Sequence, residues 1–387
     1  MKQKIAIFGS TGSIGKTLIN IIDQDKKNFE ITLLTAKDNY KDLLKQAKKF
    51  KVKNLIITNE KSYKKLIMKT KNLNIRVFND FDNFTKIFNK KIDYVMSSIS
   101  GFDGLIPTLK IIKYTKKIAI ANKEAIICGW NLIRRELTFR KTQFIPIDSE
   151  HFSLWYGLKN NNDKIKKIYL TASGGPFINL PLNKFKKINI KQALNHPNWK
   201  MGKKITVDSA TMMNKVFEII EARNIFNLSY DQILILTHPK SYIHSIINFQ
   251  NGLIKLIAHD TNMTIPIFNS LYQENKNSFV KSKNIDLIKL NNLNLKKVDI
   301  KRFPLTKILN DIPQKNSLFE TILVSSNDEF VKLFLKKKIG FTDISKNIIK
   351  FVKKDEFKKY KLVSPKNVRE IVELNKYVRF KINSKSI

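Results

Sequence analysis

Strand-like and helix-like segments alternate without a break from residue 1 to about residue 147. The strand-like runs are short and apolar, and they are Ile5–Phe8, Ile31–Leu34, Leu55–Ile57, Tyr94–Met96, Ile118–Ile120 and Phe144–Ile147. Helical patterns separate them at Thr17–Ile22, Tyr40–Lys48, Ser62–Met68, Phe81–Phe88, Leu105–Tyr114 and Glu124–Leu137. Strictly alternating βα units predict an α/β fold with a parallel, doubly wound sheet, whose ligands bind at the carboxyl ends of the strands.

The turn after the first strand contains three glycines and reads Gly-Ser-Thr-Gly-Ser-Ile-Gly at residues 9–15. Glycines at such a turn let the backbone bend tightly and approach a pyrophosphate, and the N-terminus of the following helix favours the anion. The spacing is a variant of the usual fingerprint, and a tight βα turn without a ligand is the alternative. Its place between a first strand and a helix favours a Rossmann-like dinucleotide-binding domain over residues 1–147.

The second strand ends at Lys37, Asp38 and Asn39, where the adenosine ribose of a bound dinucleotide is expected. An acidic side chain here usually bonds the ribose 2′-hydroxyl of NAD, whereas a cation favours the 2′-phosphate of NADP. Lys37 and Asp38 therefore point to different cofactors, and these residues alone leave the choice open.

Two carboxylates, Asp148 and Glu150, flank Ser149 where the apolar alternation ends. In an extended chain the positions i and i+2 point to the same side, so the two charges repel unless a cation, a proton or solvent relieves them. A hard divalent ion held by carboxylate oxygens is the natural solution, and a solvated acidic turn is the alternative.

The stretch from Ile205 to Arg223 combines polar groups on a predicted helix. Asp208 or Ser209 is expected to cap the start of that helix. Asn214, Lys215 and Glu218 follow at helical spacing, so an amide, an ammonium and a carboxylate share one face. A solvated ion pair between the last two is the alternative to a functional group.

Two loops between these segments have the composition of binding loops. The Ser-Gly-Gly sequence at 173–175 can present a hydroxyl and backbone N–H groups to a phosphate, although a plain turn is also possible. The sequence His-Pro-Asn-Trp-Lys-Met-Gly at 196–202 predicts a lid, with a core-anchored loop as the alternative. His238 and His244 have no metal-ligand spacing to a third partner and are interpreted as structural.

We expect four segments along the chain. Residues 1–147 form the dinucleotide-binding domain, and residues 148–275 form a catalytic domain with a mixed sheet and a lid loop at 196–204. Residues 276–303 form a polar linker, and residues 304–387 form a small helical domain. The helical patterns of that domain are Lys307–Asn310, Asn316–Val324, Asp328–Lys336, Asp343–Val352 and Val368–Tyr377.

The net charge of +40 raises the question of polyanion binding. Lysines are spread over every segment and form no stripe, so we expect no specific nucleic-acid partner and only loose binding at low salt. No apolar run is long enough to span a bilayer, no signal peptide is evident, and Cys128 is the single cysteine. We therefore expect a cytoplasmic protein without a membrane partner.

Taken in order, these motifs closely resemble those of the 1-deoxy-D-xylulose 5-phosphate reductoisomerase family over essentially the whole chain. The matching runs are GSTGSIG at 9–15, ANKE at 121–124, DSEH at 148–151, SGGPF at 173–177, HPNW at 196–199, MGKKITVDSATMMNK at 201–215, IHS at 243–245 and FTDI at 341–344. The resemblance implies a homodimeric oxidoreductase that uses NADPH and Mg²⁺ or Mn²⁺. Its reaction is the rearrangement and reduction of 1-deoxy-D-xylulose 5-phosphate to 2-C-methyl-D-erythritol 4-phosphate in non-mevalonate isoprenoid synthesis.

The resemblance also implies roles for individual residues. The implied metal ligands are Asp148, Glu150 and Glu218, which with Lys123 make up the catalytic group. The implied substrate-binding residues are Ser149, Ser173, His196, Trp199, Ser209, Asn214 and Lys215. The implied cofactor-binding residues are Gly9, Thr11, Gly12, Ser13, Ile14, Lys37, Asn39, Asn122, Glu124 and Gly202.

Three places depart from the pattern of that family. Lys37-Asp38 stands where the family has Gly-Lys, so an NADP preference rests on a shifted lysine. Thr261-Asn262-Met263 replaces Pro-Asp-Met, and Asn327-Asp328 replaces Asn-Glu. Another NAD(P)-dependent sugar-phosphate reductase is the alternative enzyme, but it leaves three carboxylates without a task. A non-catalytic polyanion-binding protein is the alternative outside the enzymes.

Overall fold

The computed structural model describes residues 1–273, 280 and 284–384, and the chain divides into two compact units. The first unit comprises Met1–Ala125, Ile133–Asp148 and Met263–Lys281, and the second comprises Ile126–Leu132, Ser149–Asn262 and Ser282–Ile387. The four-segment division expected from the sequence stays a prediction. Part of its linker, at 276–279 and 281–283, lies outside the described residues.

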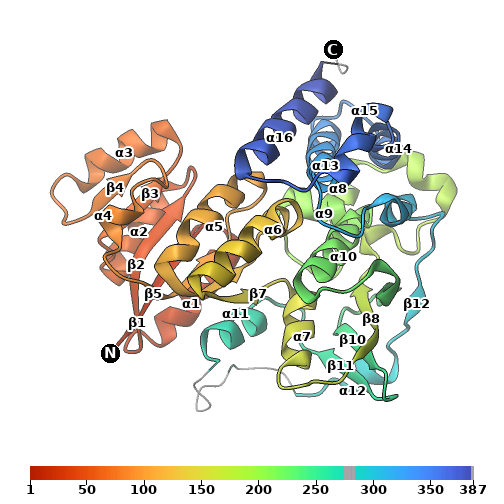
Figure 1. The fold of residues 1–387 in the computed structure, drawn as a ribbon, viewed down its shortest axis with the longest axis horizontal. Helices are drawn as coiled ribbons and strands as arrows, with labels where there is room; N and C mark the ends of the chain where they lie inside the picture. The colour runs from red at the N-terminus through yellow and green to blue at the C-terminus, as the bar shows by residue number, and fades with distance from the viewer. Residues whose placement is uncertain (274–279, 281–283, 385–387) are drawn as a thin grey trace. The chain divides into compact units, whose positions relative to one another are not determined.

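The first unit is built on a seven-stranded sheet with the order β4-β3-β2-β1-β5-β6-β7 (Figure 1). Every pairing of neighbouring strands in this order is parallel, which confirms the predicted doubly wound sheet. The strands are β1 (Gln3–Phe8), β2 (Phe29–Ala36), β3 (Asn54–Ile57), β4 (Arg76–Phe78), β5 (Ile92–Ser97), β6 (Thr115–Ile120) and β7 (Gln143–Pro146). The strand order reverses beside β1, and this reversal is where such sheets bind ligands.

Helices connect the strands of the first unit. They are α1 (Ser13–Gln24), α2 (Tyr40–Phe50), α3 (Glu60–Thr70), α4 (Phe84–Ile87), α5 (Leu105–Ile111), α6 (Lys123–Arg140, whose middle belongs to the second unit) and α11 (Thr264–Leu271). The edge strand β4 was not predicted, because its three residues, of which two are apolar, are too few to form a recognisable strand pattern. The core strand β1, by contrast, buries four consecutive residues.

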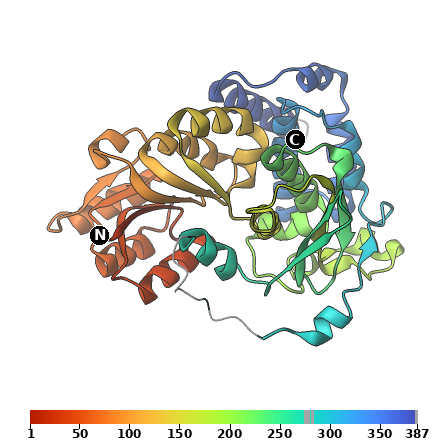
Figure 2. The same ribbon diagram turned by 60° about the horizontal axis from the view of Figure 1, so that its bottom comes forward.

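The second unit contains a five-stranded sheet with the order β11-β10-β8-β9-β12. Its strands are β8 (Ile165–Ala172), β9 (Ile233–Thr237), β10 (Ile243–Phe249), β11 (Ile254–Ala258) and β12 (Lys296–Lys297). The β8–β9 pair is parallel and the other pairs are antiparallel, so the predicted mixed sheet is confirmed. Helix α7 (Ser149–Leu158) packs on β10 and β11 (Figure 2).

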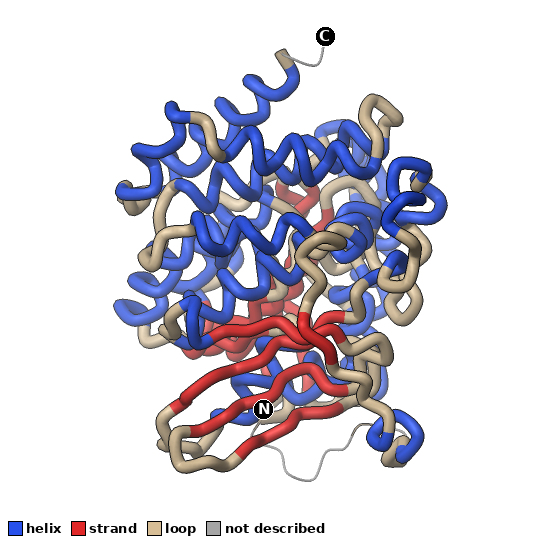
Figure 3. Tube along the Cα trace, turned by 90° about the vertical axis from the view of Figure 1, so that its right-hand side faces the viewer, coloured by secondary structure: helices blue, strands red, loops and turns tan. Residues whose placement is uncertain are grey.

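The remaining helices of this unit are α8 (Ile190–Ala193), α9 (Lys203–Ala210), α10 (Met213–Phe226), α12 (Leu287–Asn291), α13 (Phe319–Leu335), α14 (Phe341–Val352), α15 (Asp355–Lys358) and α16 (Val368–Asn383) (Figure 1). Figure 3 distinguishes the helices, in blue, from the strands, in red. Two predicted helices at 316–324 and 328–336 are one continuous helix, α13. The polar residues in the middle of α13 are buried and hydrogen-bonded: Ser325 donates to Asn375, and Asn327 donates to Asp208. Among the described residues, no helix is long and apolar enough to cross a membrane.

Candidate active site

Asp148 directly precedes α7, and Glu150 lies in the first turn of that helix. The expectation that these carboxylates share one side of an extended chain is therefore wrong. They come together because the chain turns into a helix at Ser149, whose hydroxyl donates to Glu150 Oε2 at 2.7 Å. Negative charge is favoured at this place, since the first turn of a helix presents unpaired backbone N–H groups.

Helix α10 supplies the third carboxylate, Glu218. The expectation that Asp208 or Ser209 caps this helix is wrong, because both lie in the last turn of α9. The helix instead begins after Met212, a buried residue in the left-handed conformation with a φ of 66°. The predicted shared face is confirmed: Asn214 donates to Glu218 Oε1, and Lys215 forms an ion pair with Glu218 Oε2.

The carboxylates of Asp148, Glu150 and Glu218 offer oxygen atoms within 4.8 Å of one another. Lys215 Nζ also lies 3.2 Å from Glu150 Oε1, and Lys123 pairs with Asp148. These five groups carry three negative and two positive charges. Their oxygen donors and their excess negative charge fit a hard divalent cation such as Mg²⁺.

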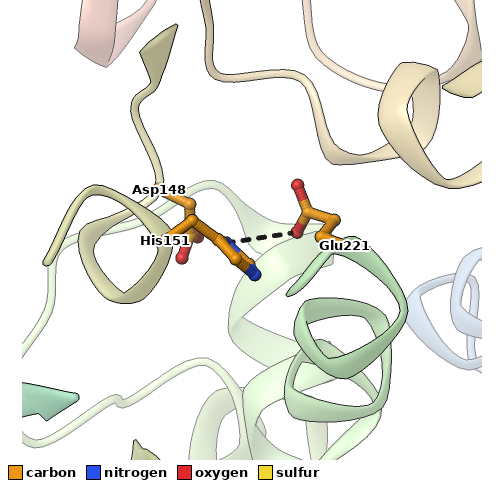
Figure 4. Close-up of side chains that lie close together, drawn as sticks. All are labelled: Asp148, His151 and Glu221. Atoms are coloured by element: carbon orange, nitrogen blue, oxygen red, sulfur yellow. Dashed lines mark ion pairs between the residues drawn. The ribbon is translucent and has the colours of Figure 1, made fainter. Parts of the chain in front are cut away.

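A second donor group overlaps the first and consists of Asp148, His151 and Glu221 (Figure 4). Glu221 lies one turn beyond Glu218 on α10, and its Oε2 is 3.9 Å from His151 Nδ1. His151 Nε2 lies 2.8 Å from the backbone oxygen of Glu218, and because a carbonyl only accepts, Nε2 is the donor. His151 therefore ties the start of α7 to the backbone of a candidate metal ligand.

Ser173 and His196 form the second part of the site. His196 Nδ1 accepts the backbone N–H groups of Asn198 at 3.1 Å and Trp199 at 3.0 Å, so the ring proton is on Nε2 and points to Ser173 Oγ at 3.0 Å. Burial lowers the pKa of His196 to about 4, which keeps the ring neutral near pH 7. Ser173 Oγ also accepts from the Gly175 N–H, so its own O–H proton remains to be donated to an anion.

The loop of Ser173 packs against the end of α9, which carries Ser209. Gly175 has a φ of 65°, and a Cβ atom there would lie 3.0 Å from the Ser209 backbone oxygen. This close approach requires glycine and places the two hydroxyl-bearing segments side by side. Asn214 and Lys215, also expected to bind the substrate, have their side chains directed at the carboxylates.

In the first unit, the turn at residues 9–15 has the geometry expected of a phosphate-binding turn. Gly9 has a φ of 75°, and a Cβ atom on Gly15 would lie 2.4 Å from the Gly9 backbone oxygen, so α1 packs closely on the turn. Gly12 is the N-cap of α1 and has no side chain to occupy the first N–H groups of the helix. These N–H groups suit an anion, in line with the cofactor-binding role that the family resemblance implies for Thr11, Ser13 and Ile14.

Other predicted cofactor residues already have partners in this unit. Lys37 Nζ lies 2.9 Å from Asp103 Oδ2, and Asn39 caps α2 by accepting the Asp42 N–H. Asn122 caps α6 and donates to the backbone oxygens of Ile99 and Gly101, which orders the loop after β5. Glu124 lies in the first turn of α6, and in the second unit Gly202 is the N-cap of α9.

Three family models match this chain. Models of 1-deoxy-D-xylulose 5-phosphate reductoisomerase and its C-terminal domain cover residues 5–129 and 144–226, and a DXP reductoisomerase C-terminal domain covers 259–381. The 1-deoxy-D-xylulose 5-phosphate reductoisomerase of Pelagibacter ubique is 61% identical and is covered completely, as is this chain. The enzyme of a Sulfurihydrogenibium species is 38% identical over 92% of each chain. The chain belongs to the 1-deoxy-D-xylulose 5-phosphate reductoisomerase family.

Solved reductoisomerase structures agree with this assignment. The enzyme of Zymomonas mobilis in complex with NADPH has a TM-score of 0.88 and 28% identity, over 100% of this chain and 99% of that one. A second reductoisomerase, in complex with NADPH, fosmidomycin and magnesium, has a TM-score of 0.86 and 29% identity over 99% and 98% of the two chains. The family and the fold predicted from the sequence are therefore confirmed.

Two features of this reductoisomerase site were not predicted from the sequence. His244, interpreted as structural, has its Nδ1 4.0 Å from Glu150 Oε1 and its ring beside that of Trp199, with centroids 6.2 Å apart. His238 is structural as expected, since both ring nitrogens bond to backbone groups. The spacing of Glu218 and Glu221 at i and i+3 was a detectable signal for the second donor group.

Proposed function

We propose that this chain catalyses the NADPH- and divalent-metal-dependent conversion of 1-deoxy-D-xylulose 5-phosphate to 2-C-methyl-D-erythritol 4-phosphate. The observation that supports this most directly is the carboxylate cluster of Asp148, Glu150 and Glu218, in which three acids face two lysines. A dehydrogenase that only transfers hydride has no use for this cluster. The alternative of another sugar-phosphate reductase therefore has less support.

We assign the metal to Asp148, Glu150 and Glu218. A bound Mg²⁺ or Mn²⁺ supplies Lewis-acid polarisation of substrate oxygens and a template for the carbon rearrangement. Lys215 holds two of the ligands through ion pairs, and Asn214 holds one of them through a hydrogen bond. Lys123 and Ser149 are assigned to the reacting end of the substrate, because each contacts one of the metal-ligand carboxylates.

We assign the substrate phosphate to Ser173, His196 and Ser209. The neutral His196 orients Ser173 so that the serine O–H points outward as a donor, and the loop packing brings Ser209 near it. A phosphate held away from the reacting carbons contributes binding energy that positions them. Trp199 belongs to the loop between His196 and Gly202, which we propose closes over the bound substrate and excludes water.

The wider properties expected from the resemblance stay part of this proposal. They are a homodimer, a cytoplasmic location, the use of manganese as well as magnesium, and the absence of a specific nucleic-acid partner. Sedimentation of the purified chain tests the homodimer directly, since a single species at twice the chain mass is expected.

The deciding experiment follows absorbance at the nicotinamide band with 1-deoxy-D-xylulose 5-phosphate and Mg²⁺ or Mn²⁺. Oxidation of NADPH that stops after chelation and resumes when metal is restored is the expected result. Oxidation that continues unchanged after complete chelation would contradict the metal assignment. Folded protein that oxidises neither NADPH nor NADH would contradict the proposed function.

Cofactor preference has its own test at Lys37. This side chain pairs with Asp103 at 2.9 Å, and both are about two-thirds exposed, so a 2′-phosphate can compete for the lysine. Lys37→Ala is expected to raise the KM for NADPH by about threefold to tenfold, as for loss of one exposed charge-assisted contact. The KM for NADH is expected to stay unchanged. Equal effects on both cofactors would show that Lys37 does not contact the 2′-phosphate.

A further inference from the structure

The second unit contains another group of charges, in which α13 packs against both α9 and α16. Its acids are mostly buried, whereas Lys204, Arg379 and Lys332 are partly exposed. Lys204 and Asp208 form a pair on α9 at 3.0 Å, and Lys204 Nζ also lies 3.1 Å from Asp328 Oδ1 on α13. Asn327 of α13 donates to Asp208 Oδ1 at 2.9 Å. Helix α9 is thus bonded to α13 through two side chains of its own.

Helix α16 completes this group through Arg379. Its Nη2 lies 2.6 Å from Asp328 Oδ2, its Nη1 lies 3.3 Å from Glu329 Oε2, and its Nε donates to Asn375 Oδ1 at 2.8 Å. Glu329 also pairs with Lys332 at 2.8 Å. All three nitrogen atoms of this guanidinium have a partner, and a lysine has no such rigid fork of donors.

We call this group the helix-anchoring network; its charged members are Lys204, Asp208, Asp328, Glu329, Lys332 and Arg379. Three acids and three bases alternate along it, so its charges balance. The side chains of Asp208 and Glu329 are almost completely buried. Burial raises the pKa of Asp208, whereas Lys204 and Asn327 oppose that shift by stabilising its ionised form.

Helix α9 depends on such contacts for its position. It has eight residues, and a helix of that length is marginal without tertiary packing. Its N-cap is Gly202, which offers no capping side chain. Ion pairs with buried partners add little stability compared with apolar packing of the same volume, but in some proteins they fix one arrangement of the groups that they join. The ion pairs of α9 are therefore expected to fix the position of this helix more than to raise the stability of the fold.

Helix α9 carries Ser209 directly after Asp208, and the Ser173 loop packs on the same turn. We propose that the helix-anchoring network holds α9 in the register required for phosphate binding, and that Asp208 and Arg379 are positioning residues for the substrate. This inference rests on the proposed function, because it assigns Ser209 to the substrate phosphate. Neither residue contacts the metal-ligand carboxylates in any bond described above.

The test compares two arginines of the same helix, Arg379 in the network and Arg369, which is exposed and pairs with Glu373. R379Q is expected to raise the KM for 1-deoxy-D-xylulose 5-phosphate by about threefold to thirtyfold, as for loss of a packed coupling network. The kcat is expected to fall by no more than the same factor, because the phosphate also positions the reacting carbons, and the KM for NADPH is expected to change by less than about twofold. R369Q is expected to leave all three at wild-type values.

A second readout does not depend on activity. Hydrogen exchange of the amides at 203–210 is expected to be faster in R379Q than in R369Q, while exchange in α7 stays the same in both. D328N is the second network variant and replaces R379Q if that protein does not fold. R379K is expected to recover only part of the wild-type KM, because lysine cannot make all three contacts.

Each outcome decides the inference. Wild-type protein without turnover would contradict the proposed function, and hydrogen exchange alone would then test the network. If the amides at 203–210 exchange at the wild-type rate in both R379Q and D328N, the network does not hold α9, whatever the activity of these variants. Faster exchange with an unchanged KM for the substrate would overturn the positioning role. Faster exchange together with a raised KM, absent in R369Q, is the result that supports it.

Discussion

The carboxylate cluster and the helix-anchoring network are built from the same kinds of side chain, and neighbouring helices, α10 and α9, contribute to them. In the cluster, Asp148, Glu150 and Glu218 face only two lysines. In the network, three acids alternate with three bases. Buried like charges repel, so the cluster has a place for a further cation, whereas the acids and bases of the network are equal in number. Local charge balance thus separates a site that binds a ligand from one that holds a helix.

The largest expected effect on activity comes from substitution of Glu218 in the carboxylate cluster. Glu218→Gln keeps the shape of the side chain but removes the excess negative charge on which metal binding depends. We expect turnover to fall by at least about 10²- to 10³-fold, as for loss of one preorganised electrostatic group in an active site. Metal-dependent NADPH oxidation is the measurement, and near-normal activity would refute the assignment of the metal ligands.

Metal-induced stabilisation provides the control for that variant. A ligand that binds only the folded state stabilises it by about 2.7 kcal/mol at a concentration of 100 times its Kd. We expect Mn²⁺ to raise the Tm of the wild type and of R379Q, but not that of Glu218→Gln. A rise of equal size in all three proteins would place the ion elsewhere. Glu373→Gln, an exposed change on α16, serves as the matched control for loss of a carboxylate.

A smaller effect is expected at Ser173, which belongs to neither charge group. Ser173→Ala removes the outward hydroxyl donor and leaves His196 Nε2 without its acceptor. A hydrogen bond to a charged group contributes about 1.5–3 kcal/mol, so the KM for the substrate should rise by about 10- to 100-fold.

Steady-state kinetics at several pH values check the Ser173 prediction. The pKa of His196 is about 4, so this ring stays neutral and the ratio of variant to wild-type KM should not vary between pH 6 and 8. A ratio that changes across this range would show that His196 is charged in the working enzyme. Ser153→Ala is the control for removal of a buried serine hydroxyl, since this hydroxyl donates to the Ser149 backbone oxygen within α7 and contacts neither His196 nor the Ser173 loop in any hydrogen bond of the described residues.

The sequence predicted the parallel sheet well, because each core strand is an apolar run between helical patterns. It also identified the three carboxylates, although the reasons were partly wrong: Asp148 and Glu150 come together at a helix start and not along an extended chain. The helix-anchoring network could not be predicted, since it joins residues 204–208 to residues 327–379 through tertiary packing. Local spacing shows only its first pair, Lys204 and Asp208, at i and i+4.

Glu320 on α13 is a buried carboxylate that belongs neither to the carboxylate cluster nor to the helix-anchoring network, so it provides a third case for comparison. It is completely buried, and its Oε2 accepts from the Ser317 hydroxyl at 2.6 Å and the Ser317 N–H at 3.1 Å. Burial raises the pKa of Glu320 to about 7, although Ser317 and Arg223 oppose the shift. Among the described residues Glu320 forms no ion pair, and below pH about 7 its carboxyl group is expected to retain a proton.

The consequence is a pH-dependent stability with a defined sign. Below pH about 4.5 the carboxyl is protonated in both states, but between pH 4.5 and 7 the unfolded chain ionises first, so stability falls as pH rises. Glu320→Gln removes this dependence. The difference in free energy of unfolding between variant and wild type should therefore shift by up to about 3 kcal/mol in favour of the variant from pH 4 to 8. Urea unfolding at both pH values measures it, and parallel curves would show that Glu320 is ionised in the folded protein.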